Sequence, residues 1–286
     1  MSRRRSLFAA LALAAVGVLA GCGSGGGVTA PTVQPARTFG LEGFEPSGPV
    51  SPGRPTVVSF TIRTPSGKPL TQYKTCCDPH AGVDVLVVRS DDSHVQYIDA
   101  DAEPDGRVSV PVVFPAPGRY RIVVDAYPKV TGPDTPFNFQ LFTWVTVRGA
   151  YRPKALPSFQ QTEVVDGYRF RIEGHPRLRA IEPGFLVFHV TDPTGRKTVF
   201  TTWRGALAHA IFFHQGDLAY SHTHVCKPGA IYCFSVLGNV RVTGQSTTPG
   251  ILKAGVLLPE SGTWRLFLLT YLSGRVLTVP FTLHVR

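Results

Sequence analysis

The chain has 286 residues, 43% of them hydrophobic and 17% charged, which is the composition of a globular protein with a sizeable core. The formal net charge of +10 comes from scattered basic residues, so the chain lacks the basic runs typical of nucleic-acid-binding tails. The 29 glycines and 25 prolines favour many turns and argue against long helices.

Residues 1–21 are predicted to be a signal peptide. Arg3–Arg5 form a positive n-region, and the apolar run Leu7–Ala20 that follows is too short to span a bilayer comfortably. The run ends in Leu19-Ala20-Gly21-Cys22, which resembles the lipobox of bacterial lipoproteins. This resemblance implies cleavage before Cys22 and lipidation of its thiol.

Residues 22–37 form a flexible tether that begins with the glycine-rich stretch Gly23–Gly27. No later apolar stretch is long enough for a transmembrane helix. We therefore expect a protein anchored in the cell membrane by lipid and facing the extracytoplasmic side. Nucleic acid is not expected as a partner there, whereas the positive charge suits anionic lipid or a cell-wall polymer.

The remaining chain contains two copies of one unit. The segment "SFTIRTPSGKPL" at 59–70 corresponds to "VFHVTDPTGRKT" at 187–198, and "FPAPGRYRIVV" at 114–124 corresponds to "LPESGTWRLFL" at 258–268. The repeat predicts two domains, at 38–149 and 158–286, joined by a proline-containing junction.

Each copy has the pattern of an all-β sandwich. Short runs rich in Val, Ile, Phe and Tyr, such as "YRIVVDAY" and "GFLVFHV", alternate with turn clusters that contain Pro, Gly and Asp. The Gly-x-Tyr and Gly-x-Trp entries to a late strand are similar to the tyrosine corner of Ig-like domains. The fold class we predict is therefore all-β, with two tandem Ig-like or cupredoxin-like β-sandwich domains.

Four of the nine histidines lie within residues 205–225. The segments "AHAIFFH" and "LAYSHTHV" flank Gln215-Gly216-Asp217, which predicts a β-hairpin. If Gly216-Asp217 is the turn, His209 pairs with His224; if Gln215-Gly216 is the turn, it pairs with His222.

In both registers His209, His222 and His224 share one face of the hairpin, because side chains alternate along a strand. His214 lies on the opposite face. Cross-strand neighbours are about 5 Å apart, so three imidazoles at these positions can converge on one ion. Half-buried histidines that bind no metal are the alternative interpretation.

The spacing His-x12-His-x-His also resembles that of bacterial secreted proteins with YtkA-like or cupredoxin-like sandwich domains. The resemblance implies handling of copper or another heavy metal, with His209, His222 and His224 as ligands. In the first copy the same spacing falls on Asp84, Tyr97 and Asp99. Copper or zinc would not choose that trio, so the site in the first domain is predicted to be degenerate.

Besides Cys22 the chain contains Cys76, Cys77, Cys226 and Cys233. Outside the cytoplasm an even number favours disulfides, and four cysteines allow three pairings. We prefer Cys226–Cys233 because these two bracket the turn-forming segment "KPGAIY"; the alternative pairings link the two domains. Cys226 also continues the alternation of His222 and His224, so a mixed His/Cys metal site stays open.

No nucleophile elbow, Walker loop, HExxH motif or suggestive carboxylate pair is present, and we predict that the protein is not an enzyme. Met1 is the only methionine, which leaves Cu(II) or Zn(II) on imidazoles as the expected metal. Two functions follow: a metal-binding envelope lipoprotein, or an Ig-like envelope module that binds a protein or wall polymer without metal.

Overall fold

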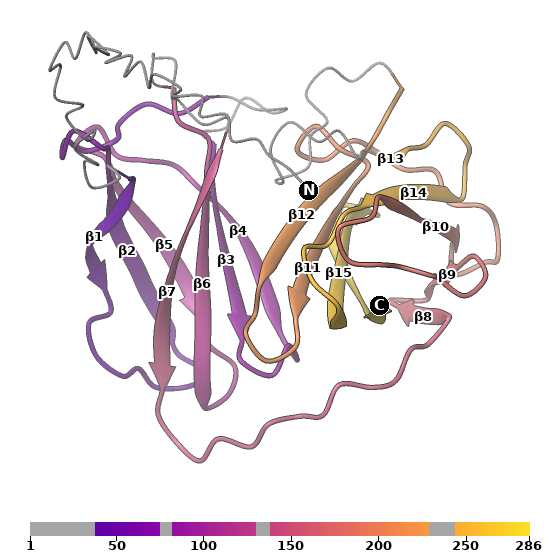
Figure 1. The fold of residues 1–286 in the computed structure, drawn as a ribbon, viewed down its shortest axis with the longest axis horizontal. Helices are drawn as coiled ribbons and strands as arrows, with labels where there is room; N and C mark the ends of the chain where they lie inside the picture. Colours follow the sequence, from indigo (N-terminus) through magenta and orange to yellow (C-terminus); the bar gives the residue numbers. More distant parts are fainter. Residues whose placement is uncertain (1–37, 75–81, 130–137, 229–243) are drawn as a thin grey trace, which may run out of the picture. The chain divides into compact units, whose positions relative to one another are not determined.

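A computed structural model describes residues 38–74, 82–129, 138–228 and 244–286 (Figure 1). In these ranges the regular secondary structure consists of β-strands alone. The predicted signal peptide and Cys22 lie outside the described residues, as do Cys76, Cys77 and Cys233. Within the described part, no helix could cross a membrane.

The first sandwich consists of two antiparallel sheets. The three-stranded sheet has the order β1-β2-β5, and the four-stranded sheet has the order β4-β3-β6-β7. Its strands are β1 (Gly40–Glu45), β2 (Pro55–Arg63), β3 (Val83–Arg89), β4 (Val95–Ala100), β5 (Arg107–Val113), β6 (Gly118–Ala126) and β7 (Phe139–Val147).

The core of the first sandwich lies between these two sheets. Phe60 of β2 and Val110 of β5 pack in one buried cluster with Val85 of β3 and Ile122 of β6. Strand β5 alternates strictly between exposed and buried residues, as expected for a strand with one face in solvent.

The second sandwich has a four-stranded sheet of order β14-β10-β9-β8 and a five-stranded sheet of order β13-β12-β11-β15-β16. Phe188 of β10 and Leu252 of β14 pack across its core against Phe212 of β11 and Leu266 of β15. Its strands are β8 (Thr162–Val165), β9 (Tyr168–Ile172), β10 (Gly184–Thr191), β11 (Ala208–His214), β12 (Tyr220–Cys226), β13 (Gly244–Gln245), β14 (Ile251–Val256), β15 (Gly262–Leu272) and β16 (Arg275–Val285).

The two sandwiches repeat one another in detail. Gly118 and Gly262, which begin β6 and β15, have φ angles of 132° and 130°. Two residues later the hydroxyl of Tyr120 donates to the Ala116 carbonyl at 2.9 Å, and Nε1 of Trp264 donates to the Glu260 carbonyl at 3.1 Å. The predicted all-β fold of two tandem sandwiches is therefore confirmed, and the repeat extends to equivalent hydrogen bonds.

Replacing Gly262 with alanine is expected to lower the free energy of unfolding by about 1–3 kcal/mol. Its φ is in a region that L residues rarely adopt, and an added Cβ would overlap Nε2 of His214. Gly40→Ala is the control, because Gly40 has no atom within 4 Å of an added Cβ. Urea denaturation of both variants checks this, and equal stabilities would contradict it.

The outer faces of the two sandwiches, turned away from the two cores, also carry buried residues. Strand β3 is buried at all seven positions and β11 at six of seven, so both are covered on both faces. Residues 37–286 form one compact unit in which these outer faces share a third apolar cluster. That cluster contains Leu86, Val88, Val123, Ile211, Phe213, Leu218, Phe267 and Leu269.

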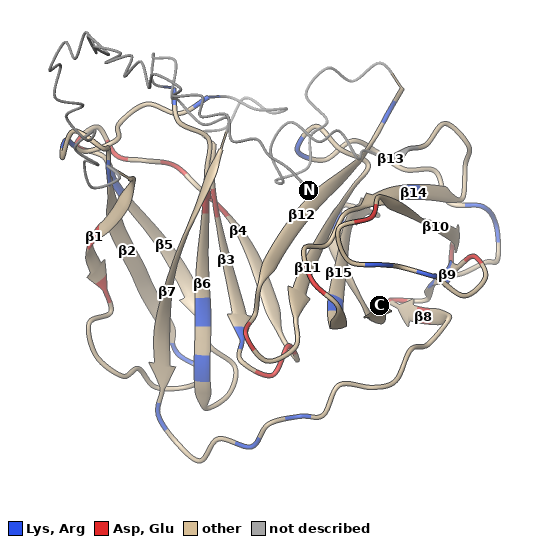
Figure 2. Cartoon of the chain, in the orientation of Figure 1, with Lys and Arg blue, Asp and Glu red and all other residues tan. Residues whose placement is uncertain are grey.

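Charged residues are spread over many strands and loops, and no strand is covered by a continuous basic run (Figure 2). Residues 148–161, between β7 and β8, contain no strand. The backbone nitrogen of Lys154 donates to Asp91 at 2.8 Å, and Arg89 donates to the Arg152 carbonyl at 3.3 Å. The junction is therefore fastened to the β3–β4 turn of the first sandwich.

Candidate metal centre

The β11–β12 hairpin adopts one of the two predicted registers. His209 pairs with His224 and Ile211 pairs with His222, so the register with His209 opposite His222 is wrong. The connection is longer than the predicted two-residue turn. The backbone nitrogen of His214 donates to the Ala219 carbonyl at 2.9 Å, which leaves residues 215–218 as the loop.

The three predicted histidines lie together. One nitrogen of each ring lies within 4.8 Å of one nitrogen of each of the others. The His209 ring centroid is 4.7 Å from that of His224 and 5.4 Å from that of His222. All three are buried, with exposed fractions of 2%, 0% and 7% for His209, His222 and His224.

Two of the rings have their outer nitrogens turned toward acceptors. Nε2 of His209 lies 3.3 Å from the carbonyl oxygen of Trp203, and Nδ1 of His222 lies 3.8 Å from Oδ2 of Asp125. Burial lowers the pKa of His209 well below its usual value, and the neighbouring His224 and His222 lower it further. A neutral His209 that donates from Nε2 has an unprotonated Nδ1.

The inner nitrogens of the same two rings face each other. Nδ1 of His209 and Nε2 of His222 are 3.2 Å apart. Two imidazole nitrogens on a tetrahedral zinc ion, with bonds of about 2.0–2.1 Å, are roughly 3.3 Å apart. Metal-bound histidines usually donate their other N–H to a carboxylate or backbone carbonyl. Nε2 of His209 has such a carbonyl, whereas Nδ1 of His222 has a carboxylate nearby but no hydrogen-bond partner among the described residues. The same distance also fits a hydrogen bond between the two rings, in which one of these two nitrogens carries a proton.

The first sandwich places its equivalent residues opposite the histidines. Asp84 pairs with Asp99, and Leu86 pairs with Tyr97, in the register of the β11–β12 hairpin. Nη1 of Arg204, from the loop before β11, lies 2.8 Å from Asp84, and its Nη2 forms an ion pair with Asp99. The two carboxylates of this trio therefore hold an arginine of the second sandwich, and a degenerate metal site in the first sandwich stays a prediction.

Burial raises the pKa of Asp84 to about 6, against the opposing effect of Arg204. The nearby charge of Asp125 contributes to this rise in the pKa of Asp84, because a like charge disfavours ionisation. The Tyr97 ring lies 5.8 Å from that of His209 and 6.1 Å from that of His222. Carboxylates and an aromatic ring of the first sandwich thus surround the histidines of the second.

Sequence reasoning did not identify Asp125 as part of the site. It is fully buried on β6, and its Oδ2 accepts a hydrogen bond from the Tyr220 hydroxyl at 3.1 Å. Asn138 and Gln140 donate to its Oδ1 at 3.1 and 3.0 Å. The only signal was an acidic residue inside the apolar run "YRIVVDAY", where a buried carboxylate needs partners.

His214 lies apart from the three, as predicted. Its Nδ1 is 2.9 Å from Asp217 and 3.6 Å from Glu260, and its ring packs on Trp264. Cys226 is buried beside Ala206 and does not belong to the histidine cluster among the described residues. Its disulfide stays a prediction, because the other candidate cysteines lie outside the described residues.

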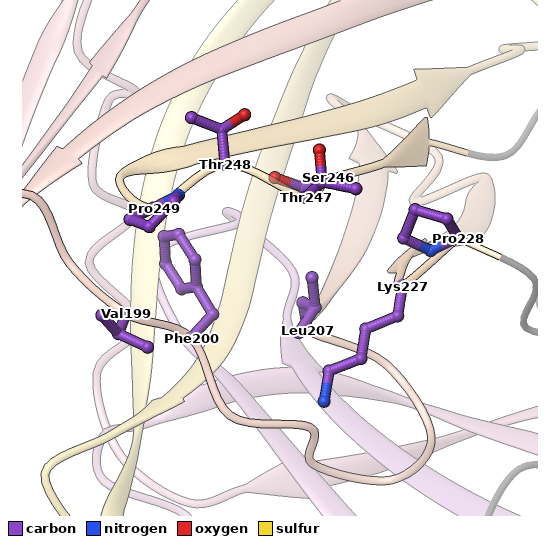
Figure 3. Close-up of a pocket in the computed structure, with 9 residues that line it drawn as sticks. All are labelled: Val199, Phe200, Leu207, Lys227, Pro228, Ser246, Thr247, Thr248 and Pro249. Atoms are coloured by element: carbon purple, nitrogen blue, oxygen red, sulfur yellow. The ribbon is translucent and has the colours of Figure 1, made fainter.

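A separate pocket of about 490 Å³ lies in the second sandwich, between the end of β12 and the residues that precede β14. Figure 3 shows Phe200 beside Pro249 at one end and Lys227 with Pro228 at the other. None of the three histidines lines it.

A family model described as a domain of unknown function, DUF8832, matches residues 162–286, which contain the second sandwich and all three histidines. No curated protein matches the chain. None of these findings supports the resemblance to YtkA-like domains or to lipoproteins, which stays a prediction.

Several solved structures of β-domains are similar to the chain at low identity. Fibronectin(III)-like modules of Clostridium thermocellum CbhA are 11% identical, with 87% of this chain and 93% of that chain covered, at a TM-score of 0.23. Titin domains z1z2 in complex with telethonin are 14% identical, with 88% and 98% covered and a TM-score of 0.20. Escherichia coli alpha-2-macroglobulin is 13% identical, with 89% and 22% covered and a TM-score of 0.27. At these values the matches do not bear on function, and the site rests on its own geometry.

Proposed function

We propose that this protein is a lipid-anchored, extracytoplasmic protein whose second sandwich binds one divalent metal ion, Cu(II) or Zn(II), through His209, His222 and His224. The observation that carries the proposal is the 3.2 Å approach of two inner ring nitrogens whose outer nitrogens face a carbonyl and a carboxylate. Imidazole is a preferred ligand of both ions. The anchor and the location rest on the sequence of residues 1–22.

The burial of the site favours retention of the ion over catalysis. A catalytic metal needs an open coordination position that substrate and water can reach. Here the ligands are nearly inaccessible to solvent and are covered by side chains of the first sandwich. We therefore propose a carrier, sensor or structural role for the ion and no enzymatic activity.

The double substitution His222→Ala/His224→Ala is expected to abolish retention of Zn(II) or Cu(II), because a single imidazole is left. The protein is purified without a histidine tag, loaded with one metal at a time, dialysed and analysed for metal content. His284→Ala is the matched control, since His284 is exposed on the same sheet. We expect one ion per chain in the parent and the control, and none in the double variant.

A parent protein that binds neither metal more tightly than the order of micromolar would overturn the metal proposal. The alternative function, an Ig-like envelope module that binds a protein or wall polymer, would then stand. Equal retention in the double variant would show that the ion sits elsewhere in the chain.

A further inference from the structure

We infer that the first sandwich supplies the counter-charge for the metal, so that ion binding and the packing of the two sandwiches on each other are coupled. This inference rests on the proposed function, because it concerns the same ion. All three ligands come from β11 and β12, yet Tyr97 of β4 and Asp125 of β6 lie against them. Trp203 and Tyr220 of the second sandwich complete these surroundings.

Charged side chains of the first sandwich lie close to the histidines. Among the described residues these are Asp84, Asp99 and Asp125, and the guanidinium of Arg204 pairs with the first two. Three carboxylates and one guanidinium leave two negative charges when the imidazoles are neutral. A divalent cation carries the opposite charge, and an uncompensated charge in a buried site is costly.

The position of Asp125 follows from its hydrogen bonds. Its Oδ1 accepts hydrogen bonds from Asn138 and Gln140, and its Oδ2 accepts one from the Tyr220 hydroxyl, so three donors fix this carboxylate in place. The same Oδ2 is the atom that faces Nδ1 of His222. At 3.8 Å this carboxylate is not hydrogen-bonded to Nδ1, but its negative charge lies beside the edge of the ring that carries Nδ1, while Nε2 on the other side of the ring faces His209.

Asp125 is therefore a positioning residue and not a ligand, and it belongs to the other sandwich. The charge of the ion would draw His222 and Asp125 together. These two residues lie on the outer faces that share the third apolar cluster, so a bound ion would also hold that cluster together. Because the two equilibria are linked, the free energy that packing of the two sandwiches adds to metal binding equals the free energy that metal binding adds to the packing.

The test is Zn(II) affinity of the full-length protein, measured by competition with a chelator. Asp125→Asn keeps the shape but removes the charge, and we expect about 10- to 100-fold weaker binding. Asp99→Asn should give a smaller loss, because Asp99 is partly exposed and pairs with Arg204. Asp101→Asn, at an exposed position beyond β4, is the control and should leave affinity unchanged.

A second readout does not depend on variants. Hydrogen exchange with and without Zn(II) should show added protection in β3 and β6, which contribute no ligand, as well as in β11 and β12. Affinity of Asp125→Asn within twofold of the parent, or protection confined to β11 and β12, would overturn the inference. Should Asp125→Asn fail to fold, Asp99→Asn and the exchange data decide. A parent protein that binds no Zn(II) is a different result and refutes the proposed function itself.

Discussion

Arg204→Met is expected to lower the free energy of unfolding by about 3–5 kcal/mol, the usual cost of removing one partner from a buried ion pair. The Arg204 side chain is 13% exposed, and its two partners are Asp84, at 12%, and Asp99, at 30%. Without the guanidinium, two carboxylates face each other across β3 and β4 in a poorly solvated environment. Urea denaturation at pH 7 measures the loss.

The triple variant Arg204→Met/Asp84→Asn/Asp99→Asn separates charge from packing. If the loss comes from uncompensated carboxylates, the triple variant should recover most of the stability, because both carboxylates that lost their partner are then neutral amides. A loss below about 1 kcal/mol in Arg204→Met would mean that the pair is solvated like a surface ion pair. The contact between Arg204 and the first sandwich would then carry little of the packing energy.

Asp92→Asn is expected to raise the free energy of unfolding by about 2–4 kcal/mol at pH 8 and to change it little at pH 4. Asp92 lies in the β3–β4 turn, fully buried, and neither side-chain oxygen has a hydrogen-bond partner among the described residues. Burial, together with the charge of the neighbouring Asp91, raises its pKa from 3.8 to about 8. Asparagine is neutral and tolerates the left-handed backbone, with φ of 56°, at this position.

The pH dependence of this gain depends on which state binds the Asp92 proton more tightly. The native state binds this proton more strongly than the unfolded chain, so its contribution to stability is complete below about pH 4 and is lost as the pH rises through about 8. Asparagine removes this loss, and the gain over the parent should therefore grow with pH. Asp84, whose raised pKa acts in the same direction, is present in both proteins and cancels. A gain that is independent of pH would contradict the assignment.

The elements of this site that depend on strand periodicity could be predicted from the sequence. The shared face of His209, His222 and His224 follows from alternation, which holds in any register with an even turn. The structure has the pairing of His209 with His224 and a four-residue loop in place of the predicted tight turn. Leu218 of this loop has a φ of 56°, a left-handed conformation that leucine rarely adopts and that the sequence therefore did not predict.

The surroundings of the site could not be predicted in this way, because they depend on how one repeat packs on the other. Spacing alone gives Asp84, Tyr97 and Asp99 the positions of the three histidines, but it does not predict that Asp84 and Asp99 pair with Arg204. Local pattern contains no information on contacts 120 residues apart along the chain. A signal for the covered outer face was the apolar run Val85–Val88 of β3, since strands with one face in solvent alternate and strands covered on both faces do not.

The most direct test of the metal site is X-ray absorption at the zinc or copper edge of protein that carries one ion. The site predicts a first shell of nitrogen or oxygen at about 2.0–2.1 Å for zinc, with the outer-shell scattering of three imidazole rings. A sulfur atom in the first shell, fewer than two imidazoles, or failure of the untagged protein to hold any ion would contradict the account.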